Sequence, residues 1–254
     1  MGSISRVGNQ HETHDPAAYG DRIADVYDDM YPEDASAGAA ADVLASLAED
    51  GPVLELGIGT GRLALPLIRR GVAVHGVESS QAMLDRLRAK PSGENIPVVI
   101  GDFSRVDLGG PYPLVFVGFN TFFALISQED QIRCFANVAA ALAEGGRFVM
   151  EAFVPDLGRF DRGQRTSTSD VTPNSVAIES SVHDQATQTV TSAHTVISAS
   201  GTHIYPVTIR YAWPSELDLM ARLAGLELEN RWASWHGGQF TSESGGHLSV
   251  WRTL

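Results

Sequence analysis

The residues best suited to chemistry form a glycine-rich turn, Glu55-Leu56-Gly57-Ile58-Gly59-Thr60-Gly61, between two apolar segments. Its three alternating glycines can adopt backbone angles closed to other residues and let a ligand approach the main chain. A P-loop would require Lys followed by Ser or Thr after the last glycine, and Arg62-Leu63 stands there instead. Arg62 also replaces the last glycine of a dinucleotide fingerprint, so the sequence disfavours NAD or FAD.

An acidic residue, Glu78, ends the next apolar segment, 21 residues after Gly57. A carboxylate at the carboxyl end of a strand can accept both ribose hydroxyls of an adenosine lying across the sheet edge. After the third apolar segment, Asp102 can accept a hydrogen bond from an adenine amino group, and Phe103 can flank the ring. Together these residues predict an adenosine-containing cofactor, against the alternative of a tight strand–helix turn without a ligand.

The elements that position these residues alternate between strand and helix from Pro52 onward. We expect strands over 53–56, 73–78, 98–100, 114–119 and 148–153, and helices over 62–70, 80–90 and 128–142. This alternation is typical of a right-handed, doubly wound α/β sheet. Before it, residues 18–48 predict two helical pieces, broken at Pro32 and Gly38.

Residues 155–211 follow a different pattern, because apolar and polar residues alternate over 176–183, 189–197 and 204–211 without a helix between them. They predict an inserted antiparallel meander, serving as a substrate platform or a dimer interface. A helix over 214–224 and strands over 226–235 and 247–252 complete the expected core. The predicted divisions are therefore a disordered tail (1–17), N-terminal helices with the cofactor-binding core (18–154), the meander (155–211) and a C-terminal part (212–254).

Composition excludes several classes of protein. Eighteen basic and 31 acidic residues give a formal charge of −13, against a nucleic-acid partner. We expect no membrane partner, because no apolar run is long enough to span a bilayer, and no secretory signal. The single cysteine, Cys134, lies in the apolar register of a helix and is interpreted as a core thiol in a cytoplasmic protein. No His, Cys and carboxylate set has metal-ligand spacing.

On these motifs the chain resembles the class I S-adenosylmethionine (SAM)-dependent methyltransferases of small-molecule type. Residues 53–61, 74–78 and 101–103 match the first three motifs of that family, and 113–119 and 142–153 resemble its fourth and fifth strands. The resemblance implies a Rossmann-like, doubly wound, seven-stranded mixed sheet with an antiparallel final strand. The N-terminal tyrosines and the meander resemble aminosugar N-methyltransferases and the glycine/sarcosine type.

The resemblance also assigns roles to individual residues. Glu55 and Gly57 would approach the methionine amino group of SAM, Glu78 would hold the ribose, and Phe119 and Asn120 would lie by the sulfonium. The implied cofactor-binding set is Tyr27, Glu55, Gly57, Gly59, Gly61, Glu78, Ser79, Met83, Asp102, Phe103, Phe119 and Asn120. No Asn-Pro-Pro-Tyr or Asp-Pro-Pro-Tyr motif follows the fourth strand, which favours a small-molecule acceptor.

The acceptor pocket is expected between the N-terminal helix, the loop after the fourth strand and the meander. Tyr19, Tyr27 and Tyr31 would form its lid, with Tyr27 nearest the cofactor, and Tyr19, Tyr31 and Phe123 would contact the acceptor. Methyl transfer needs alignment of the acceptor, and a base only if the acceptor must lose a proton. The catalytic residue is left open among His194, His203, His236 and Glu151.

The sequence thus predicts a monomeric or homodimeric SAM-dependent methyltransferase that modifies N, O or C of a small molecule in secondary metabolism. Two alternatives stay open at this point: an inactive SAM-fold binding module, and an NAD-dependent oxidoreductase.

Overall fold

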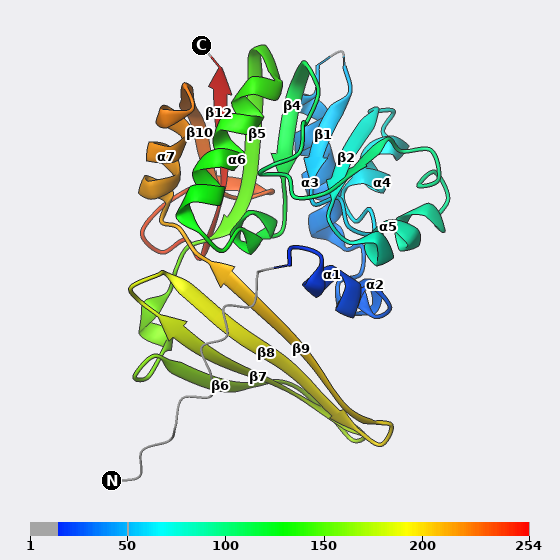
Figure 1. Cartoon of the computed structure of the whole chain (residues 1–254), viewed down its shortest axis with the longest axis vertical. Coiled ribbons are helices and arrows are strands. Elements are labelled where there is room, and N and C mark those ends of the chain that lie inside the picture. Colours follow the sequence, from blue (N-terminus) through cyan, green and yellow to red (C-terminus); the bar gives the residue numbers. More distant parts are fainter. Residues whose placement is uncertain (1–14, 50, 254) are drawn as a thin grey trace.

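A mixed sheet of eight strands forms the body of the computed structural model, which describes residues 15–49 and 51–253 (Figure 1). The strand order is β11-β10-β12-β5-β4-β1-β2-β3. The bounds are β1 (Val53–Leu56), β2 (Val74–Glu78), β3 (Val98–Ile100), β4 (Tyr112–Val117), β5 (Leu142–Phe153), β10 (Leu226–Ser234), β11 (Gly237–Gln239) and β12 (Gly246–Thr253). Strands β1 to β5 are parallel, and β12 is antiparallel to β5 and β10.

This sheet confirms the predicted Rossmann-like class, with one strand more than the seven expected. The additional strand is β11, which pairs Gln239 with Trp232 at the outer edge of β10. The predicted tail, residues 1–17, lies almost wholly outside the described residues. No helix in 15–49 or 51–253 combines the length and apolar character needed to cross a membrane.

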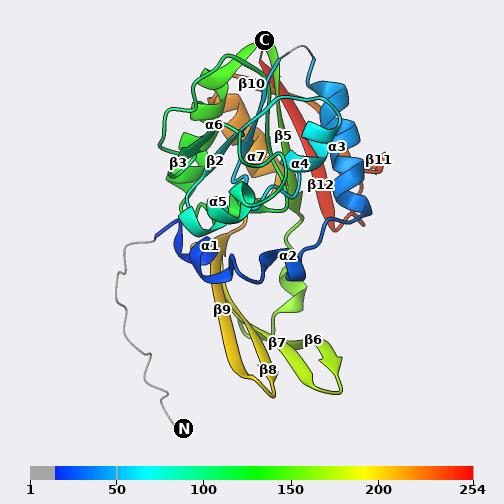
Figure 2. The same cartoon turned by 90° about the vertical axis from the view of Figure 1, so that its right-hand side faces the viewer.

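Helices cover both faces of the sheet (Figure 2). One core lies under α3 (Ala35–Leu47), α4 (Ala64–Arg69) and α5 (Gln81–Arg88), and the other under α6 (Gln128–Ala141) and α7 (Pro214–Leu223). Strand β4 is buried on both sides, with Leu114 and Phe116 in the first core and Val115 and Val117 in the second. Such apolar runs are typical of central parallel strands. Cys134 is fully buried in the second core, as predicted.

The N-terminal region forms three helices where two were expected. Helices α1 (Ala18–Ile23) and α2 (Tyr27–Met30) are short, and α3 begins where the Asp34 side chain accepts a hydrogen bond from the Ala37 N–H at 3.0 Å. Both views place α1 and α2 at the carboxyl ends of the parallel strands, beside the second sheet (Figures 1 and 2).

That second sheet is the meander, with four antiparallel strands in the order β6-β7-β8-β9. Its strands are β6 (Gln164–Thr172), β7 (Ser175–Asp184), β8 (Thr189–Ser198) and β9 (Gly201–Arg210), and two short 3₁₀ helices, η1 (Thr121–Ala124) and η2 (Leu157–Arg159), lie outside both sheets. The strand predictions for 176–183, 189–197 and 204–211 are confirmed, whereas β6 was not predicted. Glu179, His194 and Tyr205 stand opposite one another across β7, β8 and β9, which puts their side chains on one face, called the inner face below.

Candidate active site

The glycine-rich turn has the backbone conformation that a cofactor site at this edge requires. Gly57, Gly59 and Gly61 have φ angles of +70°, +56° and +88°. A Cβ on Gly57 would lie 2.5 Å from Cγ2 of Thr121, so packing requires glycine there. A Cβ on Gly59 would meet no atom closer than 4.0 Å. The turn is therefore tightly packed at one end and open to a ligand in its middle.

Glu55 places a buried carboxylate beside this turn. The residue is 4% exposed, and its Oε2 atom has no hydrogen-bond partner among the described residues. Burial raises the pKa of the Glu55 carboxyl well above its usual range, and the positive charge of Arg62 opposes that rise. A buried acceptor without a partner is energetically unfavourable. An ammonium group on a ligand would supply the missing donor.

Glu78 joins the end of β2 to the same turn. Its Oε2 accepts the Gly59 N–H at 2.8 Å, and its Oε1 accepts the Ser80 N–H at 2.9 Å. Burial raises the pKa of the Glu78 carboxyl, and the hydrogen bonds from Ser80 and Gly59 lower it. Each carboxylate oxygen can accept a further hydrogen bond. The geometry therefore suits a carboxylate that receives ribose hydroxyls.

The loop after β4 is held in an unusual conformation. Phe119 and Asn120 have positive φ angles of +52° and +63°, which are uncommon for residues other than glycine. The Phe119 N–H donates to Oε2 of Glu151 at 2.7 Å, and Oδ1 of Asn120 accepts the Phe153 N–H at 2.7 Å. Strain of this kind is maintained at functional sites by surrounding contacts. Glu151 therefore holds the loop in shape, which differs from the base role considered for it.

An aromatic cluster with one cation covers the turn. The Arg62 guanidinium lies 4.3 Å from the centre of the Phe119 ring, and the Tyr31 ring packs on Phe119 at 5.0 Å. Tyr27 packs on Tyr31, also at 5.0 Å between ring centres. Burial raises the pKa of Tyr27 to about 12, so this side chain is a neutral phenol at physiological pH. Sequence reasoning used Arg62 only to exclude other motifs, although its position directly after Gly61 places it here.

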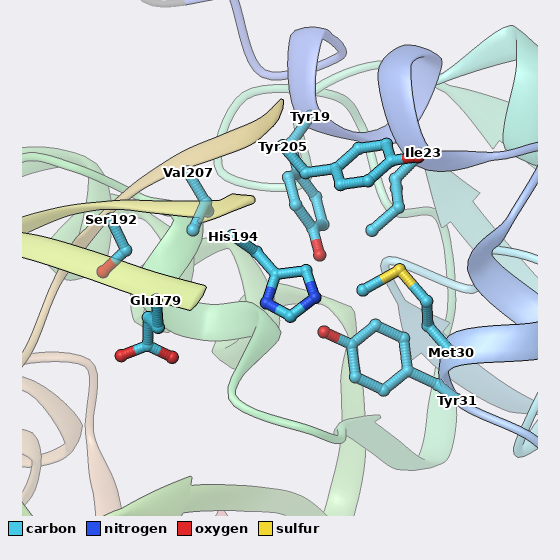
Figure 3. A pocket seen from close by; sticks show the side chains of 9 residues that line it. All are labelled: Tyr19, Ile23, Met30, Tyr31, Glu179, Ser192, His194, Tyr205 and Val207. Atoms are coloured by element: carbon cyan, nitrogen blue, oxygen red, sulfur yellow. The ribbon is translucent and has the colours of Figure 1, made fainter. Parts of the chain in front are cut away.

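A cavity of about 110 Å³ lies between α1, α2 and the inner face of the meander. Figure 3 shows the Tyr31 hydroxyl directed toward the His194 imidazole, and the Glu179 carboxylate turned away from it. Burial and the neighbouring Tyr31 raise the pKa of Tyr19 above its usual value. The lining residues are Tyr19, Ile23, Met30, Tyr31, Glu179, Ser192, His194, Tyr205 and Val207. The predicted location of an acceptor pocket thus coincides with a cavity.

Comparisons with known proteins agree with this geometry. Residues 53–146 match the family model described as a methyltransferase domain. The CcbJ methyltransferase from Streptomyces caelestis is 42% identical, covers 95% of this chain and 100% of its own, and superposes with a TM-score of 0.88. This chain belongs to the class I SAM-dependent methyltransferases. Its cofactor is SAM, and the family assignment replaces the NAD alternative.

Two further methyltransferases are similar to this chain over most of its length. The cypemycin N-terminal methyltransferase from Streptomyces sp. is 29% identical over 93% of this chain and 98% of that protein. An amino pentose methyltransferase from Micromonospora echinaspora, involved in calicheamicin biosynthesis, shares the fold with a TM-score of 0.67 at 22% identity, over 90% of this chain and 97% of that one. The similarity to both proteins thus extends over most of this chain.

The residues of the methyltransferase fit SAM at its charged ends. The unpartnered Oε2 of Glu55 suits the methionine ammonium, the open main chain at Gly59 admits the cofactor backbone, and Glu78 is placed for the ribose. Backbone oxygens and aromatic faces favour a cationic sulfonium. Phe119 is 37% exposed, but its ring already contacts the Arg62 guanidinium and Tyr31, so its place beside the sulfonium stays a prediction.

Other predicted cofactor residues are engaged within the protein. The Ser79 hydroxyl donates to the Pro16 carbonyl at 3.0 Å, and Met83 is buried against α1. Oδ1 of Asp102 accepts the Ser104 N–H at 2.8 Å, and Phe103 is buried in the second core. Their part in adenine binding stays a prediction.

Four of the residues predicted to contact the acceptor or to act as a base do not line the cavity: Phe123, His203, His236 and Glu151. Phe123 is fully buried in the core, with its ring 4.9 Å from that of Phe153. His203 is exposed toward the far end of β9, and His236 is exposed in the turn between β10 and β11. Of the four catalytic candidates, the structure brings only His194 to the cavity. Glu179 and Tyr205 also line it and were not predicted, since alternation alone does not say which face of a meander meets the core.

Proposed function

We propose that this methyltransferase transfers the methyl group of SAM to an amine nitrogen of a small molecule made in natural-product biosynthesis. The observation that carries the proposal is the cavity between the lid helices and the meander, lined by Tyr19, Tyr31, Tyr205 and His194. Tyr31 belongs both to this cavity and to the aromatic cluster over the glycine-rich turn. An acceptor there would lie next to the cofactor site.

The chemistry of the lining supports an amine. Phenol faces attract cationic groups, and Glu179 adds a carboxylate at the cavity wall. A volume of about 110 Å³ holds an amino group with a few attached carbons, so a larger acceptor would extend outward. The name of the cypemycin N-terminal methyltransferase, a relative along most of its length, also indicates a nitrogen acceptor.

In this proposal each group of residues has a distinct task. When bound, SAM supplies an electrophilic methyl group on a sulfonium. Glu55, Glu78 and the glycine-rich turn hold the cofactor, while Tyr27 and Tyr31 cover it and exclude water. An amine attacks only through its free lone pair, so a proton must leave the nitrogen. The His194 imidazole lines the cavity, and we assign it to accept that proton.

The test uses paired acceptors that differ only in the reacting atom. Amino sugars and peptides with a free N-terminus are incubated with SAM and the full-length protein, beside matched compounds carrying hydroxyl in place of amine. Methylated products are detected by mass spectrometry together with S-adenosylhomocysteine. We expect methylation of amines, a raised KM for the amine in Tyr31→Ala, and at least about a 100-fold lower kcat/KM in His194→Ala, the range of general base catalysis.

Methylation of the hydroxyl compounds alone would contradict the amine assignment. Binding of SAM without turnover on any acceptor would support the alternative of an inactive SAM-binding module. A His194→Ala variant as active as the wild type would remove the base role and leave the pocket assignment intact.

We further propose that the methyltransferase is a homodimer joined through the outer face of the meander, opposite the cavity. On that face Val182, Thr191 and Thr208 stand in one row across β7, β8 and β9, and Ile178, Thr195 and Ile204 stand in another. Val182 and Ile204 are 59% and 55% exposed.

The formal charge of −13 supports a small-molecule acceptor over a nucleic acid. A cytoplasmic location stays a prediction.

A further inference from the structure

A three-way contact joins α2 to the middle of the glycine-rich turn. The Thr60 hydroxyl donates to Oδ1 of Asp28 at 2.6 Å. Lys90, just after α5, donates to the same oxygen at 2.9 Å and to the Thr60 carbonyl at 2.8 Å, and its Nζ lies 2.7 Å from Oδ2 of Asp28. One aspartate therefore ties together residues 32 and 62 positions away in the chain.

The two ends of this contact are buried to different extents. The Lys90 and Asp28 side chains are 29% and 45% exposed, and an isolated ion pair at that exposure contributes little to stability. Thr60 is 1% exposed, so its hydroxyl and carbonyl need partners inside the protein. Asp28 accepts from the hydroxyl and Lys90 donates to the carbonyl. The contact thus satisfies buried polar groups within the turn that holds SAM.

A second contact anchors α1 next to Glu78, the acidic residue at the end of β2. The Ser80 hydroxyl donates to Oδ1 of Asp21 at 2.6 Å, and the Ser80 N–H donates to Glu78. Gly20 packs so closely on Ser80 that a Cβ on the glycine would lie 2.5 Å from the serine Cβ. Both lid helices are therefore attached to residues in or next to the cofactor site.

We propose that Asp28 is a positioning residue that links closure of the α1–α2 lid to occupancy of the SAM site. Asp28 directly follows Tyr27 in α2, and Tyr31 ends that helix, so fixing Asp28 against Thr60 sets both rings over the turn. A ligand that orders the glycine-rich turn also orders Thr60, and Thr60 orders α2 through Asp28. By linkage, fixing the lid in turn strengthens binding of the ligand. This inference rests on the SAM site and not on the amine proposal.

The test measures lid order and cofactor affinity without any acceptor. Hydrogen exchange of the full chain is followed with and without S-adenosylhomocysteine, comparing peptides over residues 18–31 with peptides over the meander. Titration calorimetry gives the Kd for S-adenosylhomocysteine. The variants are Asp28→Ala, Lys90→Met, which removes the contact from the other side, and Asp29→Asn as matched control. Asp29 is exposed and lies on the same short helix, so its variant loses the same charge.

We expect Asp28→Ala and Lys90→Met to speed exchange over 18–31 and weaken binding by about tenfold, the size of one charged hydrogen bond. Exchange in the meander should stay as in the wild type, and Asp29→Asn should match the wild type throughout. The proposal is overturned if Asp28→Ala behaves like Asp29→Asn. It is also overturned if exchange rises equally in the lid and the meander, because Asp28 would then support only the global fold. Since no acceptor is used, these outcomes are independent of the acceptor's identity.

Discussion

In the absence of a ligand, Glu55 is both buried and short of a hydrogen-bond donor among the residues described, which is unfavourable for a carboxylate. Its carboxylate is almost fully removed from water, yet Oε2 lacks a donor within the described residues. A protein under selection for stability alone would place an apolar or amide side chain there. Glu55 is therefore best explained as a residue that lowers the stability of the free protein and is compensated when a cationic group binds.

Replacing Glu55 by Gln should separate these two effects. Gln keeps the shape and removes the buried charge, so the Tm of the ligand-free protein should rise. The affinity for SAM should fall about 30-fold, equivalent to ~2 kcal/mol for a lost charged hydrogen bond. Thermal unfolding without ligand and calorimetric titration with SAM measure the two quantities. An unchanged SAM affinity would show that Glu55 does not meet the ammonium group.

The raised pKa of Glu55 determines how protein stability and SAM affinity should change with pH. Burial raises the pKa of Glu55 in the folded protein, so its contribution to stability is present below the unfolded pKa and lost as pH rises through the folded pKa. A ligand ammonium favours the ionised carboxylate, so binding should release a proton and SAM affinity should rise with pH over the same interval. The Gln variant should lose both dependences.

Among individual residues, the sequence predicted those whose role follows from the motif or strand in which they lie. Glu78 could be placed because it ends a strand next to the glycine-rich turn, and the structure bonds it to Gly59. Arg62 and Asp28 were not identified, since their partners, Phe119 for one and Thr60 with Lys90 for the other, come from distant segments. Contacts of that kind depend on tertiary packing that a single sequence does not contain.

At the scale of elements, the glycine-rich turn can be tested against a second glycine with similar backbone angles. Gly57 and Gly71 have φ angles of +70° and +83°. A Cβ on Gly57 would meet Cγ2 of Thr121 at 2.5 Å, whereas a Cβ on Gly71 would meet no atom within 4 Å. The two positions share backbone strain and differ only in the steric clash.

We expect Gly71→Ala to lower the free energy of unfolding by about 1 kcal/mol from backbone strain. Gly57→Ala should lower it by about 2 kcal/mol or more and weaken SAM binding, because the clash adds to the strain. Adding Thr121→Ser, which removes the clashing methyl group, should recover the difference. Denaturant unfolding of the wild type, Gly71→Ala, Gly57→Ala and Gly57→Ala/Thr121→Ser measures the free energy of unfolding of each protein. Equal losses of stability in the Gly57 and Gly71 variants would contradict the steric argument.

Strands differ in how much of them could be predicted. The strands β1, β2 and β4 are mostly buried, and their predicted bounds lie within two residues of the observed ones. Strand β6 was missed because most of its residues are exposed, so no apolar alternation marks it. Phe123 was expected in the pocket because it follows β4 closely, and only the geometry of η1 turns it into the core.

At the scale of the whole molecule, the two faces of the meander differ in what they meet. The inner face lines the cavity, while Val171, Val182, Ile197 and Ile204 are between 42% and 71% exposed. An extended sheet face with β-branched side chains and few charges can pair with a copy of itself about a twofold axis. Such a surface would be an aggregation hazard if it were left uncovered.

We therefore expect a dimer in sedimentation velocity at micromolar concentration and a monomer for the double variant Val182→Glu/Ile204→Glu. Two carboxylates on each face would repel across the twofold axis and resist burial. Leu223→Glu is the matched control, because Leu223 is an apolar side chain on α7 and is 74% exposed. That control should stay dimeric. A monomeric wild-type protein would remove the proposed interface.

The place of the cavity-lining residues in the chain determines how the acceptor specificity of this enzyme can change during evolution. They come from α1, α2 and the meander, which lie before and after the stretch from β1 to β5 that contains the glycine-rich turn and Glu78. Substitutions that reshape the proposed acceptor pocket can thus accumulate in residues 18–31 and 155–211 without altering the strands and turn proposed to hold SAM. Asp28 is the exception, since it lies on α2 and contacts Thr60 in the glycine-rich turn. Lineages that adopt new acceptors should therefore retain an acidic side chain at that one place in the lid.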